Sequence, residues 1–435
     1  MMKPQKYYIE TYGCQMNEAD SEIVAGMLER ATYQATREPE EADIILVNTC
    51  SVRQGADNRA LSRLSQFKSL KKNNPNLLLG MIGCVAQRDR GKIIEERPFI
   101  DFVLGPDAYR RIPEIVANKK RQVIDVQLSR TEVYDGLMPF RNSVVNAWIS
   151  IMRGCNKFCS YCIVPYTRGR ERSRSVASIV EEINAAIAEG YQEITLLGQN
   201  VNSYRYNDIR FHDLLKIIAE IKGVRRIRFT SPHPEDVNTE MLEVMRDYDN
   251  ICKHIHLPLQ SGSTKVLADM NRSYSKERYL EFVDNIRHIL PGCGITTDII
   301  VGFPGETEAD FQETLCVMDK VVFDNAYMFK YSPRPYTAAA KMKDDVPEAE
   351  KAERLNQVIA KQKIHTKQRN RSLIGTVQSV LIDGHSKKNP NEKIGRTDSN
   401  KLVILKEDHA DIGDFIDILI TGTAGVSLFG KINKP

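Results

Sequence analysis

Three closely spaced cysteines form the pattern in this chain that most clearly indicates chemistry. Cys155, Cys159 and Cys162 lie within the run RGCNKFCSYC. Thiolates at such spacing are typical ligands of an iron–sulfur cluster or of zinc. A zinc site would need a fourth Cys or His close by, and the nearest histidine along the chain is His212. A four-iron cube held by three thiolates leaves one iron open for another ligand, so the spacing favours a cube.

A second set of three cysteines is spread along the first part of the chain. Cys14, Cys50 and Cys84 each follow a short apolar run, YYIETYG, ADIILVNT and LLLGMIG. Such runs are typical of parallel strands that are buried on both faces. Helical patterns follow each run, over residues 17–30, 53–71 and 88–96. Because the carboxyl ends of parallel strands meet at one edge of a sheet, we expect the three thiols to converge there and to hold a second cluster.

The other cysteines and the composition bear on compartment and class. Cys252, Cys293 and Cys316 share no spacing with the two sets, so we interpret them as core or incidental thiols. Hydrophobic residues make up 42% of the chain and charged residues 27%, as in soluble globular proteins. The N-terminal run MMKPQKYYIE lacks the apolar core of a signal peptide, and no stretch is apolar enough to cross a membrane. Reduced thiols in ligand spacing suit a reducing compartment, so we expect a cytoplasmic protein without a membrane partner.

The chain of 435 residues is too long for one ordinary core, and its patterns divide it into three domains. Residues 5–120 alternate strand and helix patterns, which predicts a doubly wound parallel sheet. Residues 141–371 hold six strand-like runs between helical patterns, which predicts a partial (βα)6 barrel that ends in a long polar helix over 347–371. Residues 372–435 predict a small antiparallel β-barrel. The expected fold class is α/β, with an irregular linker over 119–146.

The tight cysteine motif at the mouth of a partial barrel resembles the radical S-adenosylmethionine superfamily. The resemblance covers the middle domain. It implies that the open iron chelates the amino and carboxylate groups of S-adenosylmethionine. One electron from the cluster would then break a carbon–sulfur bond and release a 5′-deoxyadenosyl radical, while the protein positions the cofactor and excludes water.

The order of the domains resembles that of one family within this superfamily. A strand–helix domain with three cysteines, a radical barrel and a small β-barrel, in that order, resemble the methylthiotransferase family. The resemblance is carried by the runs ETYGCQMNEADSE, NTCSVR, VPYTRGRERSR, SPHPED, LPLQSGS, MNRSYS, DIIVGFPGET, GHSKKN and GRTDSNK. It implies a second [4Fe-4S] cluster, on Cys14, Cys50 and Cys84, that supplies or carries sulfur. One S-adenosylmethionine would give the methyl group and another the radical.

We expect the S-adenosylmethionine pocket at the mouth of the barrel, where polar residues lie at the ends of the predicted strands. A zwitterion with a ribose needs both hydrogen-bond donors and acceptors. The motif residues that offer them at or near the mouth are Asn200, Ser231, Gln260, Arg272 and Asp298. The expected cofactors are therefore two [4Fe-4S] clusters and S-adenosylmethionine, with no catalytic residue beyond the six cluster ligands.

The motifs of this family also imply a substrate. They imply that a methylthio group is added to C2 of an N6-dimethylallyl adenosine next to the anticodon of a tRNA. The C-terminal barrel would then be a TRAM domain that binds RNA. The expected partners are a tRNA anticodon stem-loop, an external one-electron reductant and a sulfur donor that the sequence does not identify.

Two other functions fit parts of the same pattern. One is the same chemistry on a ribosomal protein, which an acidic C-terminal barrel would favour. Residues 372–435 instead contain eight Lys and Arg and eight Asp and Glu. The other is a non-catalytic iron–sulfur sensor that binds RNA, which leaves the polar strand ends without a role.

Because the net charge is only +4, an RNA surface has to be local. We expect phosphate contacts from an arginine loop that follows the tight cysteines, from the basic run 361–371 and from the C-terminal barrel. The arginine loop contains Arg168, Arg170, Arg172 and Arg174, and the candidates in the barrel are Lys387, Lys388, Arg396 and Lys401.

One residue departs from the family pattern. The family usually reads YSPRPGT after the sixth strand, whereas this chain reads YSPRPYT, with Tyr336 in place of the expected glycine. This substitution bears on the shape of the substrate mouth and leaves the cluster chemistry unchanged.

Overall fold

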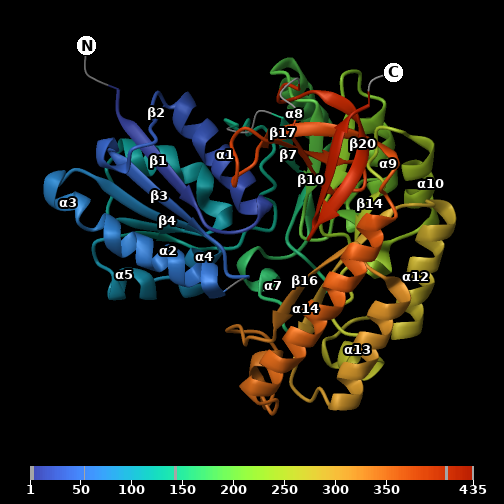
Figure 1. The fold of residues 1–435 in the computed structure, drawn as a ribbon. Helices are drawn as coiled ribbons and strands as arrows, with labels where there is room; N and C mark the ends of the chain where they lie inside the picture. The colour runs from blue at the N-terminus through green and yellow to red at the C-terminus, as the bar shows by residue number, and fades with distance from the viewer. Residues whose placement is uncertain (1–3, 53, 142–144, 407–409, 434–435) are drawn as a thin grey trace.

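The structure, a computed structural model, describes residues 4–52, 54–141, 145–406 and 410–433. Figure 1 shows an N-terminal α/β sheet beside a central α/β region, and a C-terminal β-barrel packed against that central region. The first residue of the predicted helix 53–71 and part of the predicted linker, residues 142–144, lie outside the described residues.

The N-terminal strands form a parallel sheet in the order β2-β1-β3-β4-β5-β6. The strands are β1 (Lys6–Thr11), β2 (Gln34–Ala35), β3 (Ile44–Thr49), β4 (Leu78–Gly83), β5 (Phe102–Leu104) and β6 (Val123–Asp125). Every residue of β3 and β4 is buried, which explains why their sequences are apolar without alternation. The prediction of a parallel sheet is confirmed.

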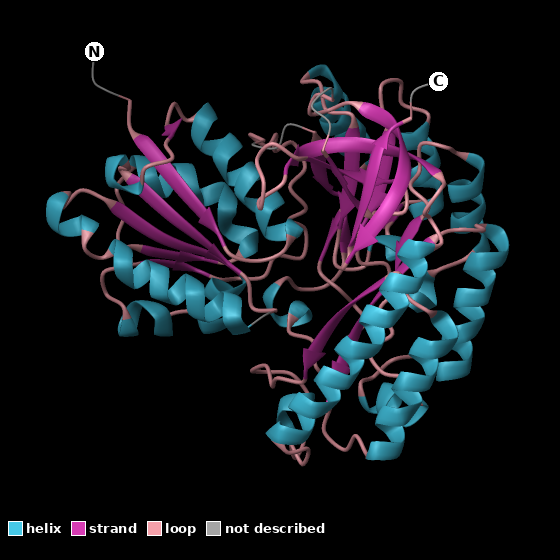
Figure 2. Ribbon diagram, viewed as in Figure 1, coloured by secondary structure: helices cyan, strands magenta, loops and turns pink. Residues whose placement is uncertain are grey.

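Helices cover both faces of this sheet (Figure 2). Along β3, Ile44 and Leu46 pack on one face while Ile45 and Val47 pack on the other, as the two-residue period of a strand requires. The first face is covered by α1 (Gln15–Arg30) and α6 (Ile112–Ala117). The other face is covered by α2 (Gln54–Phe67), α4 (Cys84–Asp89) and α5 (Lys92–Glu96). Short turns complete this part: α3 (Leu70–Asn73) and the 3₁₀ turns Pro39–Glu41 and Pro106–Arg111.

The central strands also run parallel, in two sheets ordered β13-β10-β7 and β14-β15-β16. Their bounds are β7 (Asn146–Ser150), β10 (Glu193–Leu197), β13 (Arg226–Phe229), β14 (His254–His256), β15 (Gly294–Val301) and β16 (Asn325–Lys330). A parallel bridge between Ile227 and Ile251 connects β13 to the segment before β14. The strands that the sequence predicts here are present in the predicted order.

Helices alternate with these strands, and several begin at capping residues that the sequence displays. The side chains of Ser175, Asn238, Ser275 and Thr307 accept hydrogen bonds from backbone N–H groups in the first turn of the helix that follows each. The helices are α8 (Val176–Ala188), α9 (Phe211–Ala219), α10 (Thr239–Asp247), α11 (Thr264–Asp269), α12 (Lys276–Ile289) and α13 (Glu308–Val321). Minor elements are α7 (Val164–Thr167), β8 (Met152–Arg153), β9 (Arg172–Ser173), β11 (Arg205–Tyr206), β12 (Ile209–Arg210) and 3₁₀ turns at Val201–Ser203, Pro234–Asp236 and Ala339–Lys341.

The long polar helix is α14 (Glu348–Arg371), as the sequence predicts. It lies along the central region toward the C-terminal barrel (Figure 1). Polar side chains hold it against the segment that leads into β16. Gln362 Nε2 donates to the Phe323 carbonyl at 2.9 Å, and Thr366 Oγ1 donates to the Asp324 carbonyl at 3.0 Å. A mostly polar helix is thus fixed by specific hydrogen bonds as well as by apolar packing.

The C-terminal strands close into a barrel in the order β17-β18-β19-β21-β20. They are β17 (Val377–His385), β18 (Lys393–Thr397), β19 (Leu402–Leu405), β20 (Phe415–Ala424) and β21 (Ser427–Ile432). The prediction of a small barrel is confirmed, but the barrel is not purely antiparallel, because β19 and β21 pair in parallel. The chain crosses over after β19, so that β20 pairs with β17, and β21 then returns beside β19 in the same direction.

The barrel is attached to the central region through buried arginines of β13. Arg226 Nη1 donates to the Arg396 carbonyl at 2.9 Å, and Arg228 Nη2 donates to the Thr397 carbonyl at 2.8 Å. Lys401 Nζ forms an ion pair with Asp324 at 2.6 Å and is only 9% exposed. The prediction that Lys401 contacts phosphate is therefore wrong, because its charge is used to attach the barrel.

In the part of the chain that the structure describes, no helix has the length and apolar character needed to cross a membrane.

Candidate iron–sulfur centres and the interface between them

The tight cysteines lie on the loop between β8 and α7, and backbone hydrogen bonds shape this loop. Cys155 N donates to the Gly169 carbonyl at 3.1 Å, and Cys162 N donates to the Cys159 carbonyl at 2.9 Å. Gly154 has a φ of +78°, and a Cβ there would collide with the carbonyl of Arg170. The loop therefore requires glycine at this position and presents the three thiols together.

Burial makes the thiols of Cys155 and Cys162 costly to ionise when nothing is bound. It raises the pKa of Cys155 to about 11 and that of Cys162 to about 12. Metal binding reverses this preference, because a coordinated thiol gives up its proton. All nine cysteines are free in the structure, so both thiol sets are available as ligands.

Arg272 lies beside the tight set. Its Nη1 donates to Cys159 Sγ at 3.3 Å, its Nη2 to the Pro258 carbonyl at 2.9 Å and its Nε to the Tyr274 hydroxyl at 2.9 Å. The guanidinium is thus fixed in a planar orientation next to a proposed cluster ligand. The structure brings this member of the predicted cofactor set to the cysteine loop.

Gln260, four residues after β14, and Asp298, in β15, are brought together by backbone pairing. Gln260 N donates to the Asp298 carbonyl at 2.8 Å. Gln260 has a φ of +68°, and among the described residues its buried Oε1 has no hydrogen-bond partner. Asp298 is partly exposed and lies 3.4 Å from His256 Nε2. A buried acceptor without a partner is what a missing donor, such as a cofactor amine or hydroxyl, would satisfy.

Asn200 and Ser231 lie on the loops that follow β10 and β13. Asn200 Nδ2 donates to Asp236 at 2.7 Å, and Asn200 Oδ1 accepts from His233 N at 3.1 Å. Ser231 has a φ of +58°. His233 is buried, which lowers its pKa to about 2, so its ring is neutral near pH 7. The amide of Asn200 is already engaged, so it acts mainly by fixing the loop that carries Asp236.

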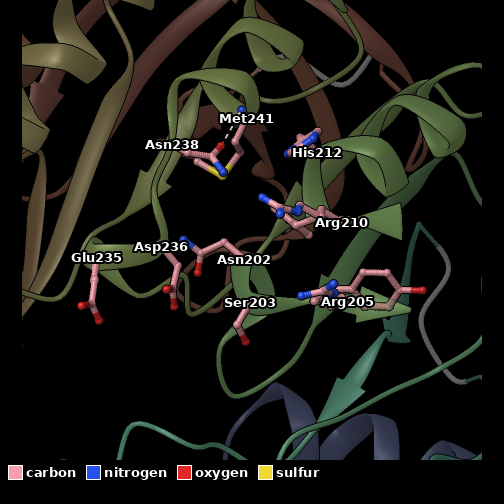
Figure 3. A pocket seen from close by; sticks show the side chains of 11 residues that line it. Asn202, Ser203, Arg205, Arg210, His212, Glu235, Asp236, Asn238 and Met241 are labelled. Atoms are coloured by element: carbon pink, nitrogen blue, oxygen red, sulfur yellow. Dashed lines mark hydrogen bonds between the residues drawn. The ribbon is translucent and has the colours of Figure 1, made fainter. Parts of the chain in front are cut away.

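A cavity of about 400 Å³ opens beside these loops (Figure 3). The carboxylates of Glu235 and Asp236 lie on one side of it, and the guanidinium groups of Arg205 and Arg210 lie on the other. Lys157 of the cysteine loop pairs with Glu235 at 2.8 Å and with Asp236 at 2.9 Å. Among the described residues that line this cavity, none belongs to the predicted cofactor set.

Glu235, Asp236 and Lys157 were not predicted from the sequence as site residues. The available signal was the position of the acids in SPHPED, directly after a strand end, and of the lysine between Cys155 and Cys159.

The spread cysteines converge at the carboxyl edge of the N-terminal sheet, as predicted. Cys14 caps α1 after β1, Cys50 follows β3 and Cys84 begins α4 after β4. The strand order reverses between β1 and β3, which is where open α/β sheets bind ligands. The Cys50 thiol donates a hydrogen bond to Cys14, which lowers the pKa of Cys14 to about 6 and raises that of Cys50. Burial raises the pKa of Cys84.

A buried polar network fixes the strand ends that carry these thiols. Asn17 Nδ2 donates to Asn48 Oδ1 and to the Thr49 carbonyl, both at 3.1 Å. Thr49 Oγ1 donates to the Ile82 carbonyl at 2.7 Å, which ties β3 to β4 next to Cys84. These residues were not predicted from the sequence, although polar Asn48 and Thr49 at the end of an otherwise apolar strand were a signal.

Unsatisfied polar groups near the spread cysteines fit an additional group there. Ser51 Oγ and Arg168 Nη1 are buried and have no hydrogen-bond partner in the described part of the chain. Within that part, no group of three or more His, Cys, Asp or Glu side chains could hold one metal ion. In a four-iron cube, each thiolate instead binds a different iron atom.

Two arginines predicted to contact phosphate are buried against helices and turns of the N-terminal part. Arg168 is 3% exposed, and it pairs with Asp20 at 2.7 Å and donates from Nε to Cys84 Sγ at 3.3 Å. Arg172 is 8% exposed and pairs with Asp107 at 2.9 Å. Their phosphate role is therefore wrong. A buried cation needs a partner, and here carboxylates of the N-terminal domain supply it.

The other two arginines of the loop differ in burial. Arg174 is also buried and pairs with Glu182 at 2.6 Å, so its phosphate role is wrong as well. Arg170 is exposed, and its guanidinium lies over the ring of Phe158 at 4.2 Å. Arg170 therefore stays a candidate for RNA contact.

The basic run 361–371 is divided in the same way. Lys361 and His365 contact Asp319, and Arg369 contacts Asp324. The exposed cations of the run are Lys363, Lys367 and Arg371, and these keep the predicted role.

Tyr336 lies on the loop after β16 that reaches the N-terminal domain. It has a φ of +70°, which explains the expected glycine, because this region of φ is costly for a bulky side chain. Tyr336 is 57% exposed, and its hydroxyl donates to the Arg88 carbonyl at 3.4 Å. Nearby, Arg334 Nη2 donates to the Val52 carbonyl at 2.9 Å, two residues after Cys50.

Comparison with protein families matches all three parts of the chain. Residues 149–315 match the Radical SAM superfamily, residues 6–105 match the Uncharacterized protein family UPF0004 and residues 371–432 match the TRAM domain. The central fold and its cysteine loop therefore define a radical S-adenosylmethionine enzyme.

Curated relatives match over nearly the whole chain. A tRNA-2-methylthio-N(6)-dimethylallyladenosine synthase from Bacteroides fragilis is 46% identical over 437 residues, which cover 98% of this chain and 95% of the relative. The synthase of the same name from Porphyromonas gingivalis is 48% identical over 440 residues, with 98% and 95% covered. The chain belongs to the family of tRNA-2-methylthio-N(6)-dimethylallyladenosine synthases. A [4Fe-4S] cluster and S-adenosylmethionine are the cofactors that this family implies.

Solved structures share the fold at low sequence identity. The radical S-adenosylmethionine methyltransferase TsrM from Kitasatospora setae superposes with a TM-score of 0.59 at 12% identity, covering 78% of this chain and 74% of TsrM. The cobalamin-dependent S-adenosylmethionine radical enzyme OxsB gives a TM-score of 0.54 at 11% identity, covering 83% of this chain and 56% of OxsB. At such identities the likeness concerns the fold alone.

Proposed function

We propose that this protein adds a methylthio group to C2 of N6-dimethylallyl adenosine next to the anticodon of tRNA. The observation that carries the proposal is the near-complete match to relatives that bear this activity in their names, at 46% and 48% identity. The two separate sets of three free cysteines supply the ligands that two clusters need.

The proposed architecture has three domains, over residues 5–120, 141–371 and 372–435. The family matches at 6–105, 149–315 and 371–432 support these boundaries. The parallel strands β7 to β16 would form an incomplete six-stranded barrel, which the bridge between Ile227 and Ile251 supports. In this arrangement the loops after the strands form one mouth that faces the spread cysteines.

We assign one [4Fe-4S] cluster to Cys155, Cys159 and Cys162 and a second to Cys14, Cys50 and Cys84. When bound, the first cluster would supply the electron for cleavage of S-adenosylmethionine, and the second would supply or carry sulfur. The chain's own residues orient the thiols and exclude water. Arg272 holds Cys159 through an N–H···S hydrogen bond, and the Asn17 network holds the strand ends at the second site.

The cofactor pocket is proposed to include Asn200, Ser231, Gln260, Arg272 and Asp298. The buried, unsatisfied Oε1 of Gln260 and the fixed guanidinium of Arg272 beside Cys159 support this set. Gln260 Oε1 would accept a hydrogen bond from the cofactor, and Asn200 would position the acidic loop that carries Asp236.

The RNA surface is proposed to use the exposed cations around the C-terminal barrel and the mouth. These are Arg170, Lys363, Lys367, Arg371, Lys387 and Lys388. Arg396, which is half-buried and pairs with Asp383 at 3.4 Å, is kept as a further candidate. Phosphate contacts would hold the stem, while the target base is extruded from its stack toward the thiol sets. An external one-electron reductant and a sulfur donor complete the set of proposed partners.

The experiment that tests the function is nucleoside mass spectrometry of tRNA from cells with and without this protein. We expect the methylthiolated nucleoside to disappear and its unmethylthiolated dimethylallyl precursor to accumulate when the gene is deleted. Complementation by the wild-type chain should restore the product, and complementation by Cys155→Ala should not. Unchanged nucleosides in the deletion strain would reject the proposal.

A further inference from the structure

Arg168 belongs to the central region, but its guanidinium contacts a cysteine of the N-terminal domain. It directly follows α7, just after the tight cysteine loop. Its Nε donates to Cys84 Sγ at 3.3 Å, and its Nη2 donates to Asp20 at 2.7 Å. With 3% of its surface exposed, Arg168 brings a positive charge to a buried thiol across the domain interface.

The backbone and neighbours of Arg168 fix this position. Arg172 Nη2 donates to the Arg168 carbonyl at 2.8 Å, and Arg172 also pairs with Asp107. Arg153 is fully buried and pairs with the same Asp107 at 3.0 Å. Three arginines of the central region thus meet two carboxylates of the N-terminal domain, and Arg168 is the one placed against the thiol.

Tyr134 closes the same cluster. Its hydroxyl lies 3.2 Å from Asp20 Oδ1, and its ring lies 3.7 Å below the guanidinium of Arg153. Asp20 is therefore held on one side by Tyr134 and on the other by Arg168. This rigidity limits how far the guanidinium can turn away from Cys84.

Attachment of the two domains does not by itself explain the geometry at Arg168. An ion pair with Asp20 requires one edge of the guanidinium, whereas Nε is directed at sulfur. In the described part of the chain, the buried Nη1 of Arg168 has no acceptor. An unsatisfied buried N–H is costly, and sulfur atoms of a cluster bound at Cys84 are acceptors that would satisfy it.

We propose that Arg168 is a positioning residue that donates to the Cys84 thiolate and raises the reduction potential of the N-terminal cluster. The proposal rests on the function proposed above, which places a cluster on Cys14, Cys50 and Cys84. A hydrogen bond and a positive charge next to a ligating sulfur stabilise the reduced, more negative state of a cluster. Because Arg168 comes from the other domain, attachment of the two domains sets the potential of the sulfur-bearing site.

The test is an anaerobic redox titration of the full-length chain, followed by electron paramagnetic resonance. Cys155→Ala, Cys159→Ala and Cys162→Ala are combined in the parent, so that the titrated signal comes from the N-terminal cluster. Arg168→Gln in this background should shift the midpoint potential to more negative values. Arg172→Gln is the matched control, because it weakens the same interface but leaves the guanidinium of Arg168 present at the thiol, so its midpoint should shift less than that of Arg168→Gln.

Arg168→Lys keeps the charge but lacks the planar set of N–H donors, so its midpoint should lie between those of the parent and Arg168→Gln. This variant also serves if Arg168→Gln fails to fold. Equal midpoints for the parent and the Arg168 variants, or equal shifts in the Arg168 and Arg172 variants, would overturn the inference. If the parent itself binds no cluster after reconstitution, the second-cluster assignment fails too, and iron analysis of the parent distinguishes that result.

Discussion

At the scale of single residues, each thiol set has one buried arginine that donates to a cysteine sulfur. Arg272 contacts Cys159 and Arg168 contacts Cys84, both at 3.3 Å. The two thiol sets thus share one arrangement, with a fixed cationic donor beside a cysteine sulfur. The donor at the tight set comes from its own domain, whereas the donor at the spread set comes from another.

The position of the cysteines in two groups could be predicted from the sequence, because close spacing and position after a strand are local signals. The roles of the arginines could not. Arg168 is 148 residues from Asp20, and Arg172 is 65 residues from Asp107, so nothing near either arginine indicates its partner. An alternating run of arginines looks the same whether it faces phosphate or a neighbouring domain.

Tyr336→Gly should stabilise the protein, by about 1 kcal/mol in the free energy of unfolding. Tyr336 has a φ of +70° and is 57% exposed, so glycine removes backbone strain while little packing is lost. Thermal unfolding of the full-length chain, followed by circular dichroism, measures the effect. Tyr336→Ala is the control, because it keeps the strain and should bring no stabilisation. A glycine variant that unfolds at a lower temperature than the alanine variant would contradict this explanation.

At the scale of elements, the sequence predicted most strands and helices of the first two domains. Continuous apolar runs predicted β3 and β4, and the alternation of six strand-like runs with helical patterns predicted the strands and helices of the central region. The parallel pair of β19 and β21 was missed. Strand pairing in a small barrel depends on how the chain crosses over between strands, and the alternation pattern within one strand carries no such information.

Loss of the two cysteine sets should affect the enzyme's activities differently. Replacing Cys155, Cys159 and Cys162 by Ala should abolish formation of 5′-deoxyadenosine, because the site of S-adenosylmethionine cleavage is lost. Replacing Cys14, Cys50 and Cys84 by Ala should spare part of this cleavage and prevent methylthiolation.

Liquid chromatography of reaction products measures both outputs of the cysteine variants, with iron analysis and Mössbauer spectroscopy to count clusters. Cys316→Ala is a control, because that thiol is exposed and belongs to neither set. Equal loss of cleavage in both triple variants, with the cluster on the tight set intact, would refute the division of roles.

Attachment of the C-terminal barrel should depend on β13. Arg228→Gln should destabilise the protein by about 3 kcal/mol, because it removes the nearer of the two cations beside buried Glu193 and the hydrogen bond to the Thr397 carbonyl. Limited proteolysis should then cut between α14 and β17 sooner than in the wild type. Lys222→Ala, at an exposed position of the same region, should change stability by less than about 0.5 kcal/mol. An Arg228 variant as resistant as the control would show that other contacts attach the barrel.

At the scale of the whole molecule, many charges join the domains and others remain at the surface. Buried Arg168, Arg172 and Lys401 pair with carboxylates across domain boundaries, whereas Lys387 and Lys388 are exposed. The net charge of +4 therefore does not show where the exposed cations lie. A count of basic residues along the sequence cannot separate the two groups, because burial is decided by the tertiary fold.

The salt dependence of RNA binding should distinguish the exposed cations from the buried ones. Removing an exposed cation that contacts phosphate lowers the slope of log affinity against log salt by about one. Lys387→Ala and Lys388→Ala should each do so without loss of thermal stability. Lys401→Ala should instead lower thermal stability and leave the slope nearly unchanged. Fluorescence anisotropy with an anticodon stem-loop measures the slopes, and an unchanged slope in both surface variants would exclude them from the RNA contact.

The most direct test of the central claim is methylthiolation by the purified, anaerobically reconstituted protein. The assay offers an anticodon stem-loop that carries N6-dimethylallyl adenosine, with S-adenosylmethionine, a low-potential reductant and a sulfide source, and mass spectrometry follows the nucleoside. The proposed function predicts that a methylthio group appears at C2 of the modified adenosine, and that Cys84→Ala prevents this. Methylthiolation of a ribosomal protein with the modified RNA left untouched would contradict it.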